Sequence, residues 1–144
     1  MTRINTIDPV YLLDEWLLAE YRELKRIPNK MRNGGYRNVR LIPAEYRMGM
    51  GHERFFLDKM LFLKKRHDSI RAEMTRRTGK EYDIIVDISD LPGHLCNDWE
   101  PEPNDHFVNV SRLYWRYHWR KSNYHYKGIV VDDEFVDALY DKFL

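Results

Sequence analysis

The chain has 144 residues, of which 43% are hydrophobic and 14% aromatic, and its formal net charge is +1. This length fits one domain with a core of its own, so we expect residues 1–144 to form a single domain. No run of about 18 apolar residues occurs, and the N-terminus is too polar for a secretory signal, so we expect neither a membrane span nor export. The only cysteine, Cys96, cannot form an internal disulfide, which fits a reducing cytoplasm.

Charge is strongly segregated along the chain. Residues 83–106 hold seven acidic residues and no Lys or Arg, whereas residues 107–128 hold five Lys or Arg and no acidic residue. Such blocks can build a positive and a negative face on one small protein, and a positive face suits nucleic acid. The alternative is that blocks of opposite charge pair with each other inside the fold.

The first predicted helix runs from Asp8, a good N-cap, through Pro9 to Arg26, and Ile27-Pro28-Asn29 ends it. Its apolar face carries Val10, Leu13, Leu17 and Leu24. The opposite face carries Glu15, Ala19, Arg22 and Arg26. Glu23 falls at the edge of the apolar stripe, where a carboxylate can be partly desolvated beside two guanidinium groups. This layout suits chemistry on a polyanion, although an ordinary amphipathic helix with a solvated Glu23–Arg26 pair has the same pattern.

A second helix is predicted from about Glu53 to Arg77, with Gly79 as its C-cap. His67 falls on the apolar seam of this helix, which favours a core histidine over a metal ligand. His52 precedes the helix and either faces a ligand or caps the turn. The acidic segment 81–105 is interrupted by prolines and is predicted to be a loop. We expect no metal and no other cofactor, because His94 and Cys96 lack a second ligand pair at zinc-site spacing.

A third helix is predicted from about Asp105 to Trp119. Arg112, Arg116 and Arg120 form a basic stripe on it, flanked on one side by Trp115 and Trp119 and on the other by Val110, Leu113 and Tyr117. A basic and aromatic segment, residues 121–128, follows. Basic side chains interleaved with aromatic ones can bind phosphates and stack on bases; the alternative is core aromatics with solvated arginines.

Residues 129–144 are predicted to form a short amphipathic helix, an extension that packs back onto the domain. Asp132 or Asp133 can cap it, and Phe135, Leu139 and Phe143 share one face. The whole pattern predicts an all-α fold: a compact single domain of three main helices with long loops, plus the short C-terminal helix.

Three blocks of sequence resemble the phage-type pyrimidine-dimer DNA glycosylases, also called endonuclease V of the ultraviolet-repair kind. The first is Met1-Thr2-Arg3-Ile4-Asn5 with Ala19-Glu20-Tyr21-Arg22-Glu23-Leu24 and Arg26. The second is Gly51-His52 followed by Phe55-Phe56, Asp58-Lys59, Phe62-Leu63 and Lys65-Arg66. The third is Asp87-Ile88-Ser89-Asp90 and Ser111-Arg112-Leu113 leading to Tyr124, Tyr126 and Gly128. Together the blocks cover about residues 1–128.

The resemblance implies a compact, mostly helical enzyme that excises a damaged base and then cleaves the strand at the abasic site. Its nucleophile would be the α-amino group of Thr2 after removal of Met1, and Glu23 would be its catalytic carboxylate. An α-amine with a pKa near ~8 is partly neutral at physiological pH, unlike a lysine. The implied partner is double-stranded DNA containing a damaged or abasic site, bound by a monomer. The implied DNA contacts are Arg3, Glu15, Arg22, Arg26, Arg112, Arg116, Arg120, Lys121, Asn123, Tyr124 and Tyr126.

The chain departs from the family pattern at several positions. Asn123 stands where a tryptophan is expected, His125 replaces a lysine and Lys127 an aromatic residue, while Glu15 and Trp16 replace a glutamine and a histidine. The favoured lesion is therefore open between a cyclobutane pyrimidine dimer, an oxidised or ring-opened base and a modified phage base. Two other functions compete: a non-catalytic DNA-binding module, and a metal-dependent nuclease that uses His94 or His106.

Overall fold

The computed structural model describes residues 3–119 and 122–144. In this part of the chain the fold is mostly helical with one two-stranded sheet, which confirms the predicted all-α class. The helices are η1 (Pro9–Tyr11), α1 (Asp14–Glu23), α2 (Arg26–Arg32), α3 (His52–Phe55), α4 (Met60–Thr78), η2 (Gly93–Leu95), α5 (Pro103–Trp119), α6 (Asp133–Tyr140) and η3 (Asp141–Phe143). The strands are β1 (His125–Tyr126) and β2 (Ile129–Val130). No helix among the described residues is long and apolar enough to cross a membrane.

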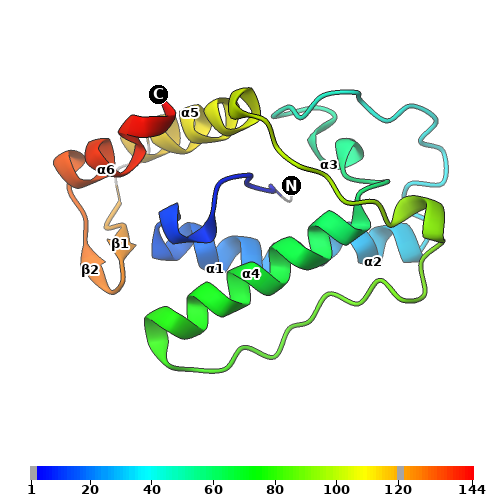
Figure 1. Ribbon diagram of the computed structural model, residues 1–144, viewed down its shortest axis with the longest axis horizontal. Coiled ribbons are helices and arrows are strands. Elements are labelled where there is room, and N and C mark those ends of the chain that lie inside the picture. The colour runs from blue at the N-terminus through cyan, green and yellow to red at the C-terminus, as the bar shows by residue number, and fades with distance from the viewer. Residues whose placement is uncertain (1–2, 120–121) are drawn as a thin grey trace.

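The N-terminal segment, residues 3–8, lies between two groups of helices (Figure 1). On one side α1 packs against α4, and on the other α5 runs with α6 beside it. The core joins both groups, because Leu17 of α1, Leu24 directly after it, Leu63 of α4 and Val110 and Leu113 of α5 are all buried. Residues 4–7 of the N-terminal segment are buried with them and are therefore held inside the fold.

The first predicted helix is wrong in its extent, because the chain is extended at Leu12 and Leu13 and α1 begins only at Asp14. Both leucines are completely buried; because extended chain points successive side chains to opposite sides, the segment is covered by packing on both sides. Asp8 does cap, but it caps η1: its carboxylate accepts the Val10 N–H at 2.9 Å. Pro28 does not end the helical region; it lies in the first turn of α2, where its missing N–H leaves no bond unmade.

The second predicted helix is two helices, because residues 56–59 separate α3 from α4. Phe56 and Leu57 are buried at this break, and Lys59 has a non-helical backbone that pairs with Cys96 in the long loop. The break therefore serves packing against residues far away in the sequence. The predicted C-cap is confirmed: Gly79 adopts φ +73° and its N–H bonds to the Thr75 carbonyl at 2.8 Å.

The third predicted helix is confirmed as α5, which begins two residues earlier than expected, at Pro103. The chain then forms an antiparallel hairpin that the sequence analysis did not predict, with Tyr126 opposite Ile129. Lys127 and Gly128 form its turn with φ +52° and +82°, as a type I′ turn requires. The carboxylate of Asp14, at the start of α1, accepts both of their N–H groups and so ties the turn to the helix.

The C-terminal helix α6 is capped as predicted by Asp132, whose carboxylate accepts the Phe135 N–H at 2.9 Å. Its buried side chains are Val136 and Tyr140, whereas Phe135, which we expected on the packed face, is 38% exposed. The Tyr140 hydroxyl donates to the Tyr11 carbonyl at 2.6 Å. The segment is thus packed against the N-terminal region of the chain.

Candidate active site

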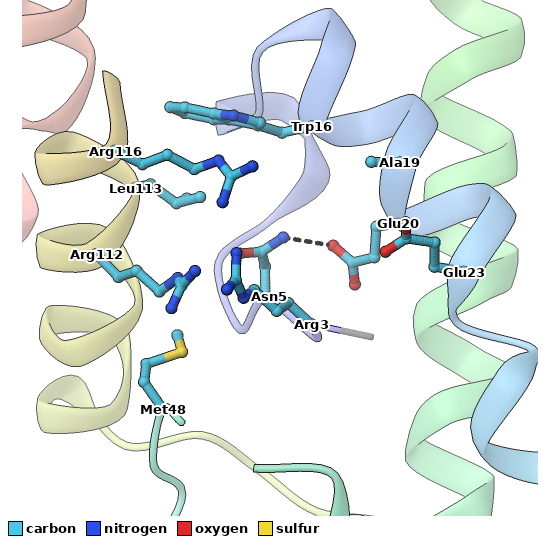
Figure 2. Close-up of a pocket in the computed structure, with 10 residues that line it drawn as sticks. All are labelled: Arg3, Asn5, Trp16, Ala19, Glu20, Glu23, Met48, Arg112, Leu113 and Arg116. Atoms are coloured by element: carbon cyan, nitrogen blue, oxygen red, sulfur yellow. Dashed lines mark hydrogen bonds between the residues drawn. The ribbon is translucent and has the colours of Figure 1, made fainter. Parts of the chain in front are cut away.

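A pocket of about 180 Å³ lies between α1 and α5, with the N-terminal segment running between these two walls (Figure 2). Its lining consists of Arg3, Asn5, Trp16, Ala19, Glu20, Glu23, Met48, Arg112, Leu113 and Arg116. The pocket unites four parts of the sequence: the N-terminal segment, one face of α1, Met48 of the loop before α3, and the basic stripe of α5. Of the residues predicted for the site, it brings together Arg3, Glu23, Arg112 and Arg116.

Positive charge is concentrated on the α5 side of the pocket. Burial lowers the pKa of the Arg112 guanidinium, and the neighbouring charges of Arg3 and Arg116 lower it further. Within the described residues, no carboxylate forms an ion pair with Arg112 or Arg116, and both side chains point from α5 toward the N-terminal segment (Figure 2). Three guanidinium groups that repel one another are stabilised by an anion between them, so this wall suits a phosphate group.

Glu23 supplies a carboxylate at the opposite side of the pocket. It is the last residue of α1, its side chain is 34% exposed, and its Oε1 lies 3.7 Å from a guanidinium nitrogen of Arg26. Arg26 is exposed, and so is Arg22; neither lines the pocket. The carboxylate therefore lines the pocket and lies close to Arg26, while Arg22 of α1 and Arg26 of α2 lie on the outer surface nearby.

Buried side chains anchor the backbone of the N-terminal segment at successive residues. The Ile4 N–H donates to Nε2 of His52 at 2.8 Å, and the Ile4 carbonyl accepts the Tyr46 hydroxyl at 2.9 Å. The Thr6 N–H donates to Oδ1 of Asn109 at 2.8 Å. These bonds come from α3 and the loop before it and from α5, so the segment is held from both sides.

A buried ion pair completes this anchor. Nε and Nη2 of Arg66 lie 2.8 and 3.1 Å from the Glu20 carboxylate, and both side chains are buried. Glu20 Oε1 also accepts Nδ2 of Asn5 at 2.7 Å, and Asn5 Oδ1 accepts Nδ2 of Asn109 at 2.6 Å. Arg66 in addition donates to the Ile7 carbonyl. A continuous polar network thus links α4, α1, the N-terminal segment and α5.

The two buried histidines are structural. Burial lowers the pKa of His52, and in its neutral form the ring can donate from Nδ1 to the Arg47 carbonyl, 2.7 Å away, while Nε2 accepts from Ile4. His52 is therefore neither solvent-facing nor a simple cap of the turn. His67 is a core histidine, as predicted: it is buried, its ring stacks on Tyr21, and burial lowers its pKa.

The aromatic residues of the tail lie outside the pocket lining. Tyr124 is buried with its ring against Trp16 and Tyr117, and the Tyr126 hydroxyl donates to the Val10 carbonyl. Both tyrosines therefore take part in packing the tail onto the protein.

Other residues predicted to contact DNA are also placed away from the pocket. Glu15 accepts the backbone N–H of His125 at 3.0 Å and lies 2.5 Å from its Nδ1, so it ties the hairpin to α1. Asn123 is exposed. Thr2, Arg120 and Lys121 lie outside the described residues.

The chain matches the family model of the pyrimidine dimer DNA glycosylases over residues 1–85. This match covers more than half of the chain, and the chain therefore belongs to that family. It includes the N-terminal segment and α1, which carry Arg3, Asn5, Glu20 and Glu23. Membership supports a DNA repair glycosylase that acts on DNA. The α5 wall of the pocket lies beyond the matched residues.

Several important residues were missed from the sequence: Asn5, Trp16, Glu20, Met48 and Asn109. For Glu20 a signal was present, because at about 100° per residue it falls between Trp16 and the stripe formed by Leu13, Leu17 and Leu24. A carboxylate there must be buried with a partner. No comparable signal marks Asn109, whose partners Asn5 and Thr6 are more than 100 residues away.

Proposed function

We propose that this protein is a bifunctional DNA glycosylase and abasic-site lyase, with a cyclobutane pyrimidine dimer as its preferred lesion. The observation that carries the proposal is the anchored N-terminal segment, which enters a pocket containing a carboxylate on one side and guanidinium groups on the other. Thr2 is joined by a peptide bond to Arg3, which lines that pocket. An α-amine freed by removal of Met1 would thus belong to a segment that is rigid from Ile4 onward.

In the proposed reaction the Thr2 nitrogen attacks C1′ of the damaged nucleotide, and the bond between C1′ and the base breaks. The departing base takes up a proton. The Thr2 nitrogen then loses a proton and the bond between C1′ and the ring oxygen opens, which leaves a C1′=N double bond, an imine. The imine acidifies the C2′ hydrogen. Removal of that proton expels the 3′ phosphate, which breaks the strand, and water then releases the enzyme from the unsaturated sugar.

Glu23 would stabilise the positive charge that develops on the sugar and transfer protons at C2′. Its place at the pocket and its 34% exposed side chain support this role, because a partly desolvated carboxylate interacts more strongly with a nearby cation than a fully solvated one. Arg3, Arg112 and Arg116 would hold the phosphates beside the lesion. Arg22 and Arg26 would contact the DNA backbone from the outer surface.

Borohydride trapping tests the imine directly. Duplex DNA with one abasic site is incubated with the protein and borohydride, and a covalent adduct is expected. Glu23→Gln should bind the same DNA but lose turnover, while Glu81→Gln, an exposed glutamate in the loop after α4, serves as the matched control. Acetylation of the N-terminus should abolish the adduct. Intact mass of the active protein tells whether Met1 has been removed.

Failure to form an adduct by a protein that begins at Thr2 would refute the imine mechanism. Salt-sensitive DNA binding without nicking, unaffected by Glu23→Gln, would instead identify a non-catalytic module. Nicking that stops in EDTA would identify a metal-dependent nuclease. A panel of duplexes carrying a pyrimidine dimer, an oxidised base or a ring-opened base then decides the lesion preference.

A further inference from the structure

Two of the four tryptophans lie together on the surface of α5. Trp115 is 62% and Trp119 72% exposed, and their rings stack at a centroid distance of 4.9 Å and an interplanar angle of 10°. The other two are more covered: Trp16 is buried against Tyr124, and Trp99 is partly buried among the aromatic rings near α3. A stacked pair of large apolar side chains left in water is a typical binding surface.

The pair directly borders the basic wall of the candidate active site. At about 100° per residue, Arg116 lies about 40° from Arg112 around the α5 axis toward the core. Trp119 lies about 20° and Trp115 about 60° from Arg112 in the opposite direction, toward solvent. The order from the core outward is therefore buried residues, arginines, then tryptophans. A ligand that leaves the pocket across the arginines meets the aromatic pair next.

Charge indicates which ligand suits this surface. Arg112 and Arg116 have no carboxylate partner among the described residues; burial lowers the pKa of Arg112, and the charges of Arg3 and Arg116 lower it further. A ligand that fits this surface therefore carries a negative charge directly next to a flat apolar ring. Single-stranded DNA supplies both, because each nucleotide carries a phosphate and a base with a free face, whereas the bases of an intact duplex are stacked on each other.

We propose that Trp115 and Trp119 form a stacking site for an unpaired nucleobase of DNA, with the adjacent phosphates bound by Arg112 and Arg116. The proposal rests on the proposed function only in taking DNA as the ligand; it needs neither the Thr2 amine nor Glu23. The site adds affinity for DNA whose bases are exposed, and this affinity does not depend on damage. It therefore favours strands that are frayed or unpaired beside the pocket.

The test uses the full chain and an undamaged oligothymidylate, so that no base excision is involved. Binding should quench tryptophan fluorescence much more in the wild type than in the double variant Trp115→Ala/Trp119→Ala, which retains Trp16 and Trp99. The double variant should lose affinity for the oligothymidylate by at least about fivefold. Trp115→Phe/Trp119→Phe should recover part of the loss, because phenylalanine also stacks.

Phe107→Ala is the matched control, since Phe107 is an aromatic residue of α5 that is 47% exposed and lies on a different side of the helix. Arg116→Gln should lower the slope of log affinity against log salt by about one, whereas the tryptophan variants should leave that slope unchanged. A thermal melt equal to that of the wild type establishes that each variant is folded.

Equal oligothymidylate affinity in the wild type and the double alanine variant would overturn the proposal. So would a wild-type dimer in sedimentation that the double variant converts to monomer, because a second copy of the chain would then cover the pair. These outcomes are independent of borohydride trapping: trapping can succeed while the stacking site fails, and the reverse result would leave the site intact while refuting the lyase.

Discussion

Removing the side chain of Asn109 should destabilise the protein and impair the reaction more than it impairs DNA binding. Asn109 is fully buried in α5, where Oδ1 accepts the Thr6 N–H and Nδ2 donates to Asn5. In Asn109→Ala the backbone N–H of Thr6 and the side-chain carbonyl of Asn5 lose these partners. Each unsatisfied buried group costs about 1–3 kcal/mol, so we expect a total loss of about 2–6 kcal/mol.

The loss is measured by urea unfolding followed by circular dichroism. For a chain of this size it corresponds to a decrease in Tm of several degrees, about 3 °C for each kcal/mol. Asn104→Ala provides the matched control, because Asn104 is an exposed asparagine in the first turn of the same helix. We expect that control to change stability by less than about 0.5 kcal/mol.

The functional part of this prediction concerns the N-terminal segment. Without Asn109 the segment keeps its bonds to His52 and Tyr46, and the Thr6 hydroxyl keeps its hydrogen bond to His106 of α5, but the Thr6 N–H and the Asn5 side chain lose their partner on that helix. The rate of borohydride trapping should fall while the dissociation constant for abasic-site DNA, set mainly by phosphate contacts, changes little. Should Asn109→Ala match Asn104→Ala in both stability and trapping rate, the network would not hold the segment, and the reasoning from anchor to catalysis would fail.

Three further predictions concern single groups. Because burial lowers the pKa of His52 below its usual 6.5, the unfolded chain binds a proton there that the folded chain does not. The free energy of unfolding that neutral His52 contributes is thus lost as pH falls below about 6.5. His52→Gln should reduce the slope of the free energy of unfolding against pH in this range by up to about 1.4 kcal/mol per pH unit. An unchanged slope would contradict this. Glu20→Gln leaves the buried guanidinium of Arg66 without its counter-charge and should cost about 3–5 kcal/mol in urea unfolding, with a loss under 1 kcal/mol counting against it. Asp132→Ala removes the cap of α6 and should lower the free energy of unfolding by about 1 kcal/mol. Asp132→Ser should restore part of this loss, because a serine hydroxyl can also accept the Phe135 N–H; equal stability of the alanine and serine variants would contradict the capping role.

The parts of the fold that sequence predicted are those set by nearby residues. The period of α5, the glycine at the end of α4 and the aspartate at the start of α6 all act within a few residues, and each was found where expected. The breaks at residues 12–13 and 56–59 were not predicted, because they follow from burial of adjacent apolar side chains against distant elements. The hairpin at residues 125–130 was missed for a related reason: its strands are only two residues long and depend on Asp14.

In the candidate site, too, features set by nearby residues were predicted and features set by distant contacts were not. Helical periodicity placed Arg112 and Arg116 on one stripe and Glu23 at the edge of another, and the structure brings both stripes to one pocket. Helical periodicity contains no information about the distance between two helices. Neither pattern therefore predicts that α1 and α5 face each other across one pocket. This arrangement depends on the N-terminal segment between them, whose bonds to Asn109 span about 100 residues.

The buried Glu20–Arg66 ion pair contributes hydrogen bonds to the N-terminal segment as well as stability. Apolar residues of similar volume would stabilise α1 against α4 at least as well, because desolvation offsets much of the attraction between buried charges. They could not, however, accept the Asn5 amide or donate to the Ile7 carbonyl, as this pair does. An apolar interface would leave the Asn5 amide and the Ile7 carbonyl without these partners, whereas the charged pair binds both and adds to the anchors at Ile4 and Thr6. The pair therefore helps to position residues 4–7 between the helices, which is the property that the proposed chemistry requires.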